Sequence, residues 1–303
     1  MASIYHYTSG SALLGIISNS EFWATDINFL NDHNEHVLGY DACIKYVETL
    51  KNDEADPFFG PWLKSLYQQL INSSRTNVID RQTYIVSFSK ISDSIAHWFS
   101  YCEKNQGYCI EFDEDLFLPA PKEGAASEFF MRFEDVNYAN FDVFSASLSQ
   151  VISKDSIVSR MLDAQKAASL IGLDVQDEKN PHTDNFLGDL ATDIMRKLMS
   201  CLMISSCSYK NKGFVHEDER RLLLIQNDLT PKNRYQPTAT KFREKNGAIY
   251  PYASAAFDRS SIKSIIVGPC SDFDFKKSGL QKLLKYHGID CEVRQSASSL
   301  RFT

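Results

Sequence analysis

Short segments of strand-forming sequence recur along the whole chain, and they constrain the fold more than any other feature. The strongest covers residues 83–89, which are dense in β-branched and aromatic side chains. Further candidate strands cover residues 4–8, 22–24, 108–112, 131–138, 221–225, 249–257, 262–267 and 289–293. Because helix-type sequence separates these strands from one end of the chain to the other, we expect one α+β domain over residues 1–303.

The middle of the chain has a different pattern. Residues 144–172 and 186–207 both have helical periodicity, and the second segment places leucine and isoleucine side chains on one stripe. We interpret residues 140–207 approximately as a helical insertion or lid on a β-rich body. Two helices packed into one common core are an equally good interpretation.

The charge of the chain argues against bulk electrostatic attraction to nucleic acids. Its formal net charge is -7, with 43% hydrophobic and 23% charged residues. A soluble globular protein typically has this composition. A local basic groove stays compatible with these values.

The cysteines predict a reduced, cytoplasmic protein. There are seven of them, an odd number, and no Cys-x-x-Cys spacing occurs. The N-terminal residues have no signal-peptide pattern, and no apolar run reaches the length of a membrane span. We therefore expect no membrane association.

Polar side chains in two predicted strands are the first candidates for a binding site. On an extended strand, His6 and Thr8 point to the same face. Ser87 and Ser89 share one face of a second strand in the same way. A lone histidine is more often a hydrogen-bonded core residue than a ligand-binding one, so the interpretation of His6 depends on its partners.

Three consecutive acidic residues precede the predicted strand 221–225. Glu217 and Glu219 are two positions apart, so an extended backbone would direct both carboxylates to one side. An acidic cluster of this kind is most often a solvated turn. Ion pairing with Arg220 and Arg221 at the surface is a further interpretation.

Several short motifs of this chain occur together in one order. They are Tyr5-His6-Tyr7-Thr8, Phe29-Leu30-Asn31-Asp32 with Glu35, Ser87-Phe88-Ser89, Trp98 with Tyr101, Gly107-Tyr108-Cys109-Ile110-Glu111-Phe112, Glu217-Asp218-Glu219-Arg220 and Ile266-Val267-Gly268-Pro269. In this order they resemble the domain-of-unknown-function family 2971 (DUF2971) over most of the chain. The family in turn resembles the ADP-ribosyltransferase fold, and Tyr5-His6-Tyr7-Thr8 is similar to the start of DNA-targeting ADP-ribosyltransferase toxins.

The resemblance implies a fold and a reaction. The implied fold is an ADP-ribosyltransferase-like split mixed/antiparallel β-sheet with flanking helices. The implied reaction transfers ADP-ribose from NAD, as substrate, to a macromolecular acceptor such as a nucleic acid. A role in a toxin or in antiviral defence and control by a regulatory partner protein would follow from this resemblance.

The resemblance also implies roles for individual residues. Glu219 would stabilise the positive charge that develops on the ribose, and Glu217 would position or deprotonate the acceptor. The remaining candidates bind the cofactor: His6, Thr8, Ser87 and Ser89 orient the dinucleotide, and Trp98 or Tyr101 stacks on a ring. For these two aromatic residues, a place in the core under a helix is at least as good an interpretation.

Two other functions remain open at this level. The first is a module that binds a nucleotide without turnover, because the acidic motif contains an extra carboxylate, Asp218, and the middle tyrosine of the transferase pattern has no clear equivalent. The second is a metal-dependent hydrolase that uses Asp32, His33, Glu35 and His36, for which the spacing is weak support. No glycine-rich dinucleotide fingerprint or P-loop is present.

Overall fold

The computed structural model describes residues 2–30, 35–50, 59–72, 83–102, 107–118, 129–170, 181–226, 240–245 and 247–298. The chain divides into two compact units. The first contains Met1–Asn31, Arg81–Val136 and Gly213–Thr303, and the second contains Asp32–Asp80 and Asn137–Lys212.

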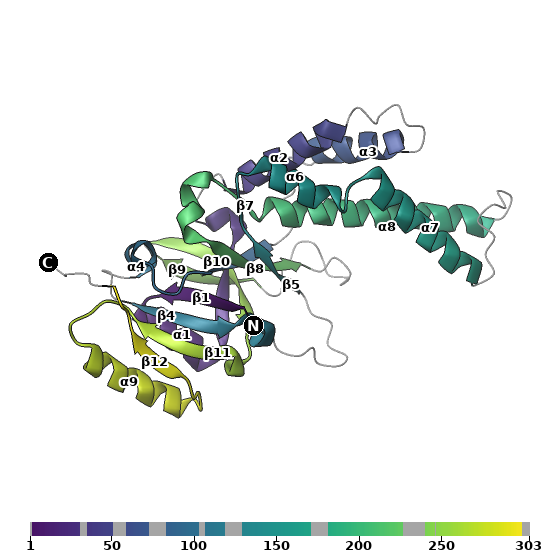
Figure 1. The fold of residues 1–303 in the computed structure, drawn as a ribbon. Helices are drawn as coiled ribbons and strands as arrows, with labels where there is room; N and C mark the ends of the chain where they lie inside the picture. Colours follow the sequence, from purple (N-terminus) through teal and green to yellow (C-terminus); the bar gives the residue numbers. More distant parts are fainter. Residues whose placement is uncertain are drawn as a thin grey trace. The chain divides into compact units, whose positions relative to one another are not determined.

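The first unit is built on a mixed β-sheet (Figure 1). Its strands are β1 (Ser3–Thr8), β2 (Glu21–Asp26), β3 (Thr83–Ser89), β4 (Tyr108–Asp113), β5 (Phe129–Asp135), β8 (Glu219–Gln226), β9 (Lys241–Lys245), β10 (Ala248–Ala256), β11 (Ile262–Val267) and β12 (Glu292–Gln295). The order is β12-β11-β4-β1-β3-β2-β10-β9, and β8 joins β3 and β5 beside this path. The β11–β12 pair is parallel, whereas the other neighbours in the sheet are antiparallel.

Strand β3 is the point at which the sheet branches. One edge of β3 pairs with β8 over its whole length. Its other pairings are short: Ser89 lies opposite Tyr5 of β1, and Ile85 lies opposite Thr25 of β2. Residues at the end of β3 are therefore close to both β1 and β8.

Strand alternation gives the sheet an apolar face and a polar face. The apolar face carries Ile4, Phe22, Phe88, Phe112 and Leu222, which belong to the main hydrophobic cluster. The polar face carries the residues that lie opposite one another in register: Tyr5, Glu111, Ser87, Ser89, Glu219 and Arg221. Because side chains alternate along each strand, the core residues lie on one face of the sheet and the polar candidate residues lie on the other.

Helices of the first unit contribute apolar side chains to the core. They are α1 (Gly10–Asn19), α4 (Ile95–Tyr101), α5 (Glu114–Phe117) and α9 (Phe273–Tyr286), with 3-10 turns η1 (Ile27–Phe29), η4 (Lys212–Glu217) and η5 (Arg259–Ser261). Ser9 caps α1 by accepting a hydrogen bond from the Ala12 N–H at 3.3 Å. Residues of α1, α5 and α9 pack on the apolar face, whereas Trp98 of α4 packs with Tyr7, Cys109 and Ile266.

The second unit is mainly helical. Its elements are α2 (Glu35–Thr49), α3 (Phe59–Asn72), α6 (Phe141–Ser149), α7 (Lys154–Leu170), α8 (Pro181–Ser206) and the short parallel pair β6 (Asn137–Tyr138) and β7 (Tyr209–Lys210). Its core joins side chains of α2 and α3 with those of α6, α7 and α8. The helices expected between residues 140 and 207 therefore pack against helices from an earlier part of the chain.

The structure confirms the coarse expectations about the fold. Helices and a mixed parallel and antiparallel sheet are present, and the sheet contains strands from the start to the end of the chain. The ADP-ribosyltransferase-like arrangement and the single domain over residues 1–303 stay predictions. No helix within the described ranges has the length and hydropathy that a membrane span requires.

Candidate functional site

The acidic triplet forms a sharp turn between η4 and β8. Asp218 adopts a left-handed backbone conformation, with φ of 40°, and its side chain is exposed. The side chains on either side of it, Glu217 and Glu219, are both buried. This turn is therefore not the solvated surface cluster that acidic runs usually form.

The end of strand β3 holds this turn in place. The Ser89 hydroxyl donates a hydrogen bond to the Glu217 carbonyl oxygen at 2.7 Å. One residue later, the backbone N–H of Lys90 donates to the Asp218 carbonyl oxygen at 2.9 Å. Ser89 also accepts from the Ile91 N–H at 3.0 Å, so it has a structural role in this turn, and its contact with a dinucleotide stays a prediction.

Glu219 forms a buried ion pair with Arg221. The Arg221 Nε donates to Oε1 and an Nη donates to Oε2, each at 2.9 Å. The two side chains are only 4% and 1% exposed. A guanidinium that binds both carboxylate oxygens balances the negative charge of Glu219.

Glu217 has a different environment. The hydroxyl of Tyr101, in the last turn of α4, donates to the Glu217 Oε1. Tyr101 itself is 38% exposed. A buried carboxylate is thus connected to solvent-exposed surface through one phenol side chain.

His97 lies one helical turn before Tyr101 and also contacts Glu217. Its Nε2 is 3.2 Å from the Glu217 carbonyl oxygen. Since a carbonyl only accepts, Nε2 carries the proton, and burial lowers the pKa of His97 and favours the neutral ring. Nδ1 is then an acceptor, and it has no hydrogen-bond partner in the described part of the chain.

His6 and Thr8, which were predicted to orient the dinucleotide, lie on the apolar face of the sheet, whereas Glu219 lies on the polar face. The His6 ring contacts Phe22 and Phe88 at centroid distances of 4.8 and 5.6 Å. Its Nδ1 donates to the Ser87 carbonyl oxygen at 3.0 Å. The physical reason is strand alternation: Tyr5, not His6, lies opposite Ser89.

Desolvation in this core lowers the pKa of His6 to about 4. The interpretation of His6 as a hydrogen-bonded core histidine is therefore the one that the contacts support. Thr8, at the end of the same strand, is buried, whereas His6 is partly buried.

The two aromatic candidates have different positions. Trp98 is completely buried, and its indole N–H donates to the Asp93 carboxylate at 2.7 Å, as expected of a core residue. Tyr101 instead reaches Glu217. Ser87 is exposed on the polar face and lies opposite Arg221 in the β3–β8 register.

Sequence reasoning gave His97 no role and placed the ion pairing of Arg221 at the surface, whereas the pair with Glu219 is buried. Arg221 follows Glu219 by two positions, so both side chains lie on one face of the strand. His97 precedes Tyr101 by four positions, which is the spacing of neighbours on one helical face. The candidate site, named here the Glu217 cluster, consists of Ser89, His97, Tyr101, Glu217, Glu219 and Arg221.

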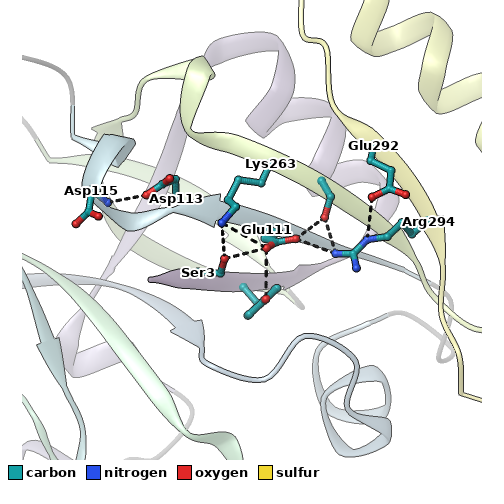
Figure 2. A network of polar contacts seen from close by, with 9 residues as sticks. Ser3, Glu111, Asp113, Asp115, Lys263, Glu292 and Arg294 are labelled. Carbon is teal, nitrogen blue, oxygen red and sulfur yellow. Dashed lines mark hydrogen bonds and ion pairs between the residues drawn. The ribbon is translucent and has the colours of Figure 1, made fainter. Parts of the chain in front are cut away.

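A second carboxylate on the polar face has its acceptor positions filled. Figure 2 shows Glu111 of β4 between Ser3 and Arg294. Oε1 accepts from Ser3 at 2.8 Å, and Oε2 accepts from Ser264 at 2.6 Å and from Arg294 at 2.8 Å. These bonds join β1, β4, β11 and β12, which indicates a structural role.

The charge state of Glu111 agrees with this role. Burial alone would raise the pKa of Glu111, but hydrogen bonds from Ser264 and Ser3 and the charge of Arg294 lower it.

Metal binding receives no support from the described residues, among which no group of three or more His, Cys, Asp or Glu side chains is arranged around a common point. The residues of the metal hypothesis, Asp32, His33, Glu35 and His36, have side chains outside the described part of the chain.

Comparison with known families gives a match to part of the chain. Residues 97–222 match the model of a family described as "Protein of unknown function (DUF2971)". This segment contains five of the six residues of the Glu217 cluster, and Ser89 precedes it. No curated protein and no solved structure matches the chain.

Proposed function

We propose that this chain, whose residues 97–222 belong to the DUF2971 family, transfers ADP-ribose from NAD to a macromolecular acceptor. Glu217 is the carboxylate that acts on the ribose. The observation that carries this proposal is the environment of Glu217, which is buried, held by its backbone in a fixed turn and bonded to the partly exposed Tyr101.

The chemistry requires a fixed negative charge near the sugar. When the bond between ribose and nicotinamide breaks, the electron pair leaves with nicotinamide, and positive charge develops on the ribose ring. A preplaced carboxylate stabilises this charge without reorganising in the reaction. The acceptor then supplies the electron pair for the new bond to the ribose.

Glu217 is a better candidate than Glu219 for this role. The sequence hypothesis gave the charge-stabilising function to Glu219, but both of its carboxylate oxygens accept from Arg221. We therefore assign Glu219 and Arg221 a positioning role, in which the pair fixes the first residues of β8. His97 and Ser89 hold the Glu217 backbone from the other side.

Transfer of labelled ADP-ribose tests the proposal. The protein is incubated with NAD labelled in the adenylate part, with cell lysate or with single-stranded nucleic acid, and the acceptor fraction is recovered. Wild type and Asp218→Asn, which changes the exposed neighbouring carboxylate, should transfer label. Glu217→Gln should reduce transfer by about 100-fold, the lower end of the effect of one electrostatic catalytic group.

The same variants define the result that contradicts the proposal. If Glu217→Gln and Asp218→Asn transfer label equally, Glu217 has no catalytic function. Expression of wild type and Glu217→Gln in a bacterial host extends the test to the proposed role in a toxin or in antiviral defence, since only the active protein should arrest growth.

Nucleotide binding without turnover is the second candidate function. A specific observation favours it: Arg221 balances Glu219, and His6 is part of the core, so two residues of the transferase hypothesis are engaged elsewhere. In that case NAD raises the melting temperature of wild type by mass action, while no nicotinamide is released.

A further inference from the structure

We propose that one end of the polar face binds single-stranded nucleic acid. This surface, named here the β2–β9–β10 strip, consists of Trp23, Thr25, Lys241, Arg243, Lys245, Tyr250 and Tyr252. It lies in the first unit, on the last three strands of the sheet order. None of its residues is part of the Glu217 cluster.

Strand register places three cations on one side of the sheet. Lys241 lies opposite Tyr252, Arg243 opposite Tyr250 and Lys245 opposite Ala248. Tyr252 in turn lies opposite Thr25 of β2. All three cations therefore share a face with the aromatic side chains, whereas Glu244 of the same strand points to the other face.

Arg243 is the residue that points to an anionic ligand. Its guanidinium lies 5.8 Å from the ring centroid of Trp23 and 5.7 Å from that of Tyr252. An Nη donates to Thr25 Oγ1 at 2.7 Å, while Nε has no hydrogen-bond partner in the described part of the chain. Among the described residues, no carboxylate contributes to the pKa shift of Arg243.

The electrostatic environment of Arg243 agrees with its lack of a counter-ion. Desolvation lowers the pKa of its guanidinium, so the cation loses hydration without gaining a negative partner. Buried charges are normally paired. A phosphate group would supply the missing negative charge and would accept from the guanidinium.

The aromatic residues favour a nucleic acid over other polyanions. The Trp23 ring packs on Tyr252 at a centroid distance of 4.9 Å and still remains 44% exposed. Phe29, which is 40% exposed, contacts Tyr250. Exposed rings beside cations stack unpaired bases.

The acidic net charge of the chain does not oppose this proposal. Glu21 is on the same face as Trp23, where its carboxylate accepts from the indole N–H at 3.3 Å. The strip thus has three cations, with the Glu21 carboxylate beside it, in a chain of net charge -7. Such a local positive surface binds a phosphate backbone independently of the bulk charge.

Binding of a fluorescein-labelled 12-nucleotide oligothymidylate, followed by fluorescence anisotropy without NAD, tests this inference. We expect Arg243→Gln and Trp23→Ala each to weaken binding about tenfold, with a smaller effect for the exposed Lys245→Gln. Lys282→Gln on the exposed side of α9 removes the same charge and should bind like wild type. Binding should weaken steeply with salt concentration.

Three results would overturn the inference. The first is no binding by wild type. The second is equal binding by Arg243→Gln, Lys245→Gln and Lys282→Gln. The third is competition by polyglutamate as strong as competition by the unlabelled oligonucleotide, which would indicate an acidic peptide as ligand. Lys245→Gln keeps the test valid if Arg243→Gln unfolds. The assay uses no NAD, so its failure is distinguishable from failure of the proposed transferase activity.

Discussion

At the scale of single residues, burial decides which polar side chains act on a ligand and which hold the fold. His6 and Glu219 look equivalent in the sequence as candidates for nucleotide chemistry. In the structure, His6 packs against Phe22 and Phe88, and Glu219 binds Arg221. Glu217 keeps a link to the surface through Tyr101. The contacts of His6 and Glu217 come from distant strands and helices, which the sequence does not identify, whereas the partner of Glu219 is two residues away on the same strand.

The Glu219–Arg221 pair predicts a large loss of stability when one partner is removed. Arg221→Met leaves a buried carboxylate without its counter-ion, and we expect the free energy of unfolding to fall by about 3–5 kcal/mol. Urea denaturation measures this value. Replacing both partners, with Glu219→Leu and Arg221→Met together, should restore most of the loss.

An exposed ion pair provides the control for this prediction. Lys90 and Asp135 are 2.7 Å apart, with side chains 40% and 60% exposed. Lys90→Met should change the free energy of unfolding by less than about 1 kcal/mol. An equal effect of Arg221→Met and Lys90→Met would contradict the account of the buried pair.

The low pKa of His6 predicts a pH dependence of stability. In the unfolded chain a histidine takes up a proton near pH 6.5, whereas His6 in the folded protein does so only near pH 4. Unfolding therefore binds a proton between these values, so the stability from neutral His6 is present above pH 6.5 and is lost as the pH falls toward 4. His6→Leu should flatten this part of the stability profile.

Titration of the histidine ring by NMR checks the same prediction directly. The His6 signals should remain those of a neutral ring down to about pH 4. His216→Gln, at an exposed position, serves as the control for replacing a histidine. A His6 pKa near 6.5 would show that the ring is solvated and not part of the core.

At the scale of elements, local patterns predict helices and strands, while long-range contacts determine their surroundings. The strands over residues 83–89, 108–112 and 262–267 were predicted within one residue at each end. Strand β9 was missed because Lys241–Lys245 has few β-branched residues, and it forms by pairing with β10. The alternation of side chains predicted which residues of a strand share a face. It did not predict which of the two faces packs on the core.

The packing of α2 against α8 predicts a sharp effect at one glycine. A Cβ atom on Gly39 would lie 2.0 Å from the carbonyl oxygen of Ser206. Gly39→Ala should force these backbones apart and destabilise the protein by about 1–3 kcal/mol. Thermal unfolding followed by circular dichroism measures the change.

Gly15 in α1 is the matched control. A Cβ there has no neighbouring atom within 4 Å, so Gly15→Ala should stabilise the helix by about 0.5–1 kcal/mol. Equal effects of the two substitutions would show that α2 and α8 do not approach each other closely at Gly39.

At the scale of the whole molecule, the chain consists of a sheet-based unit and a helical unit that alternate along the sequence. The sequence predicted the helical region at residues 140–207, but not that α2 and α3 join its core, because apolar stripes do not identify their partners. The Glu217 cluster lies entirely in the sheet-based unit. The family match over residues 97–222 includes segments of both units.

Release of nicotinamide from NAD tests the central claim most directly, because it measures cleavage of the glycosidic bond without requiring the acceptor. Purified wild type, Glu217→Gln and Asp218→Asn are compared by chromatographic detection of nicotinamide, after circular dichroism has shown that all three are folded. We predict release by wild type and Asp218→Asn and a loss of about 100-fold in Glu217→Gln. Equal release by all three proteins would contradict the assignment of Glu217, and no release by wild type, with NAD bound, would contradict the transferase activity.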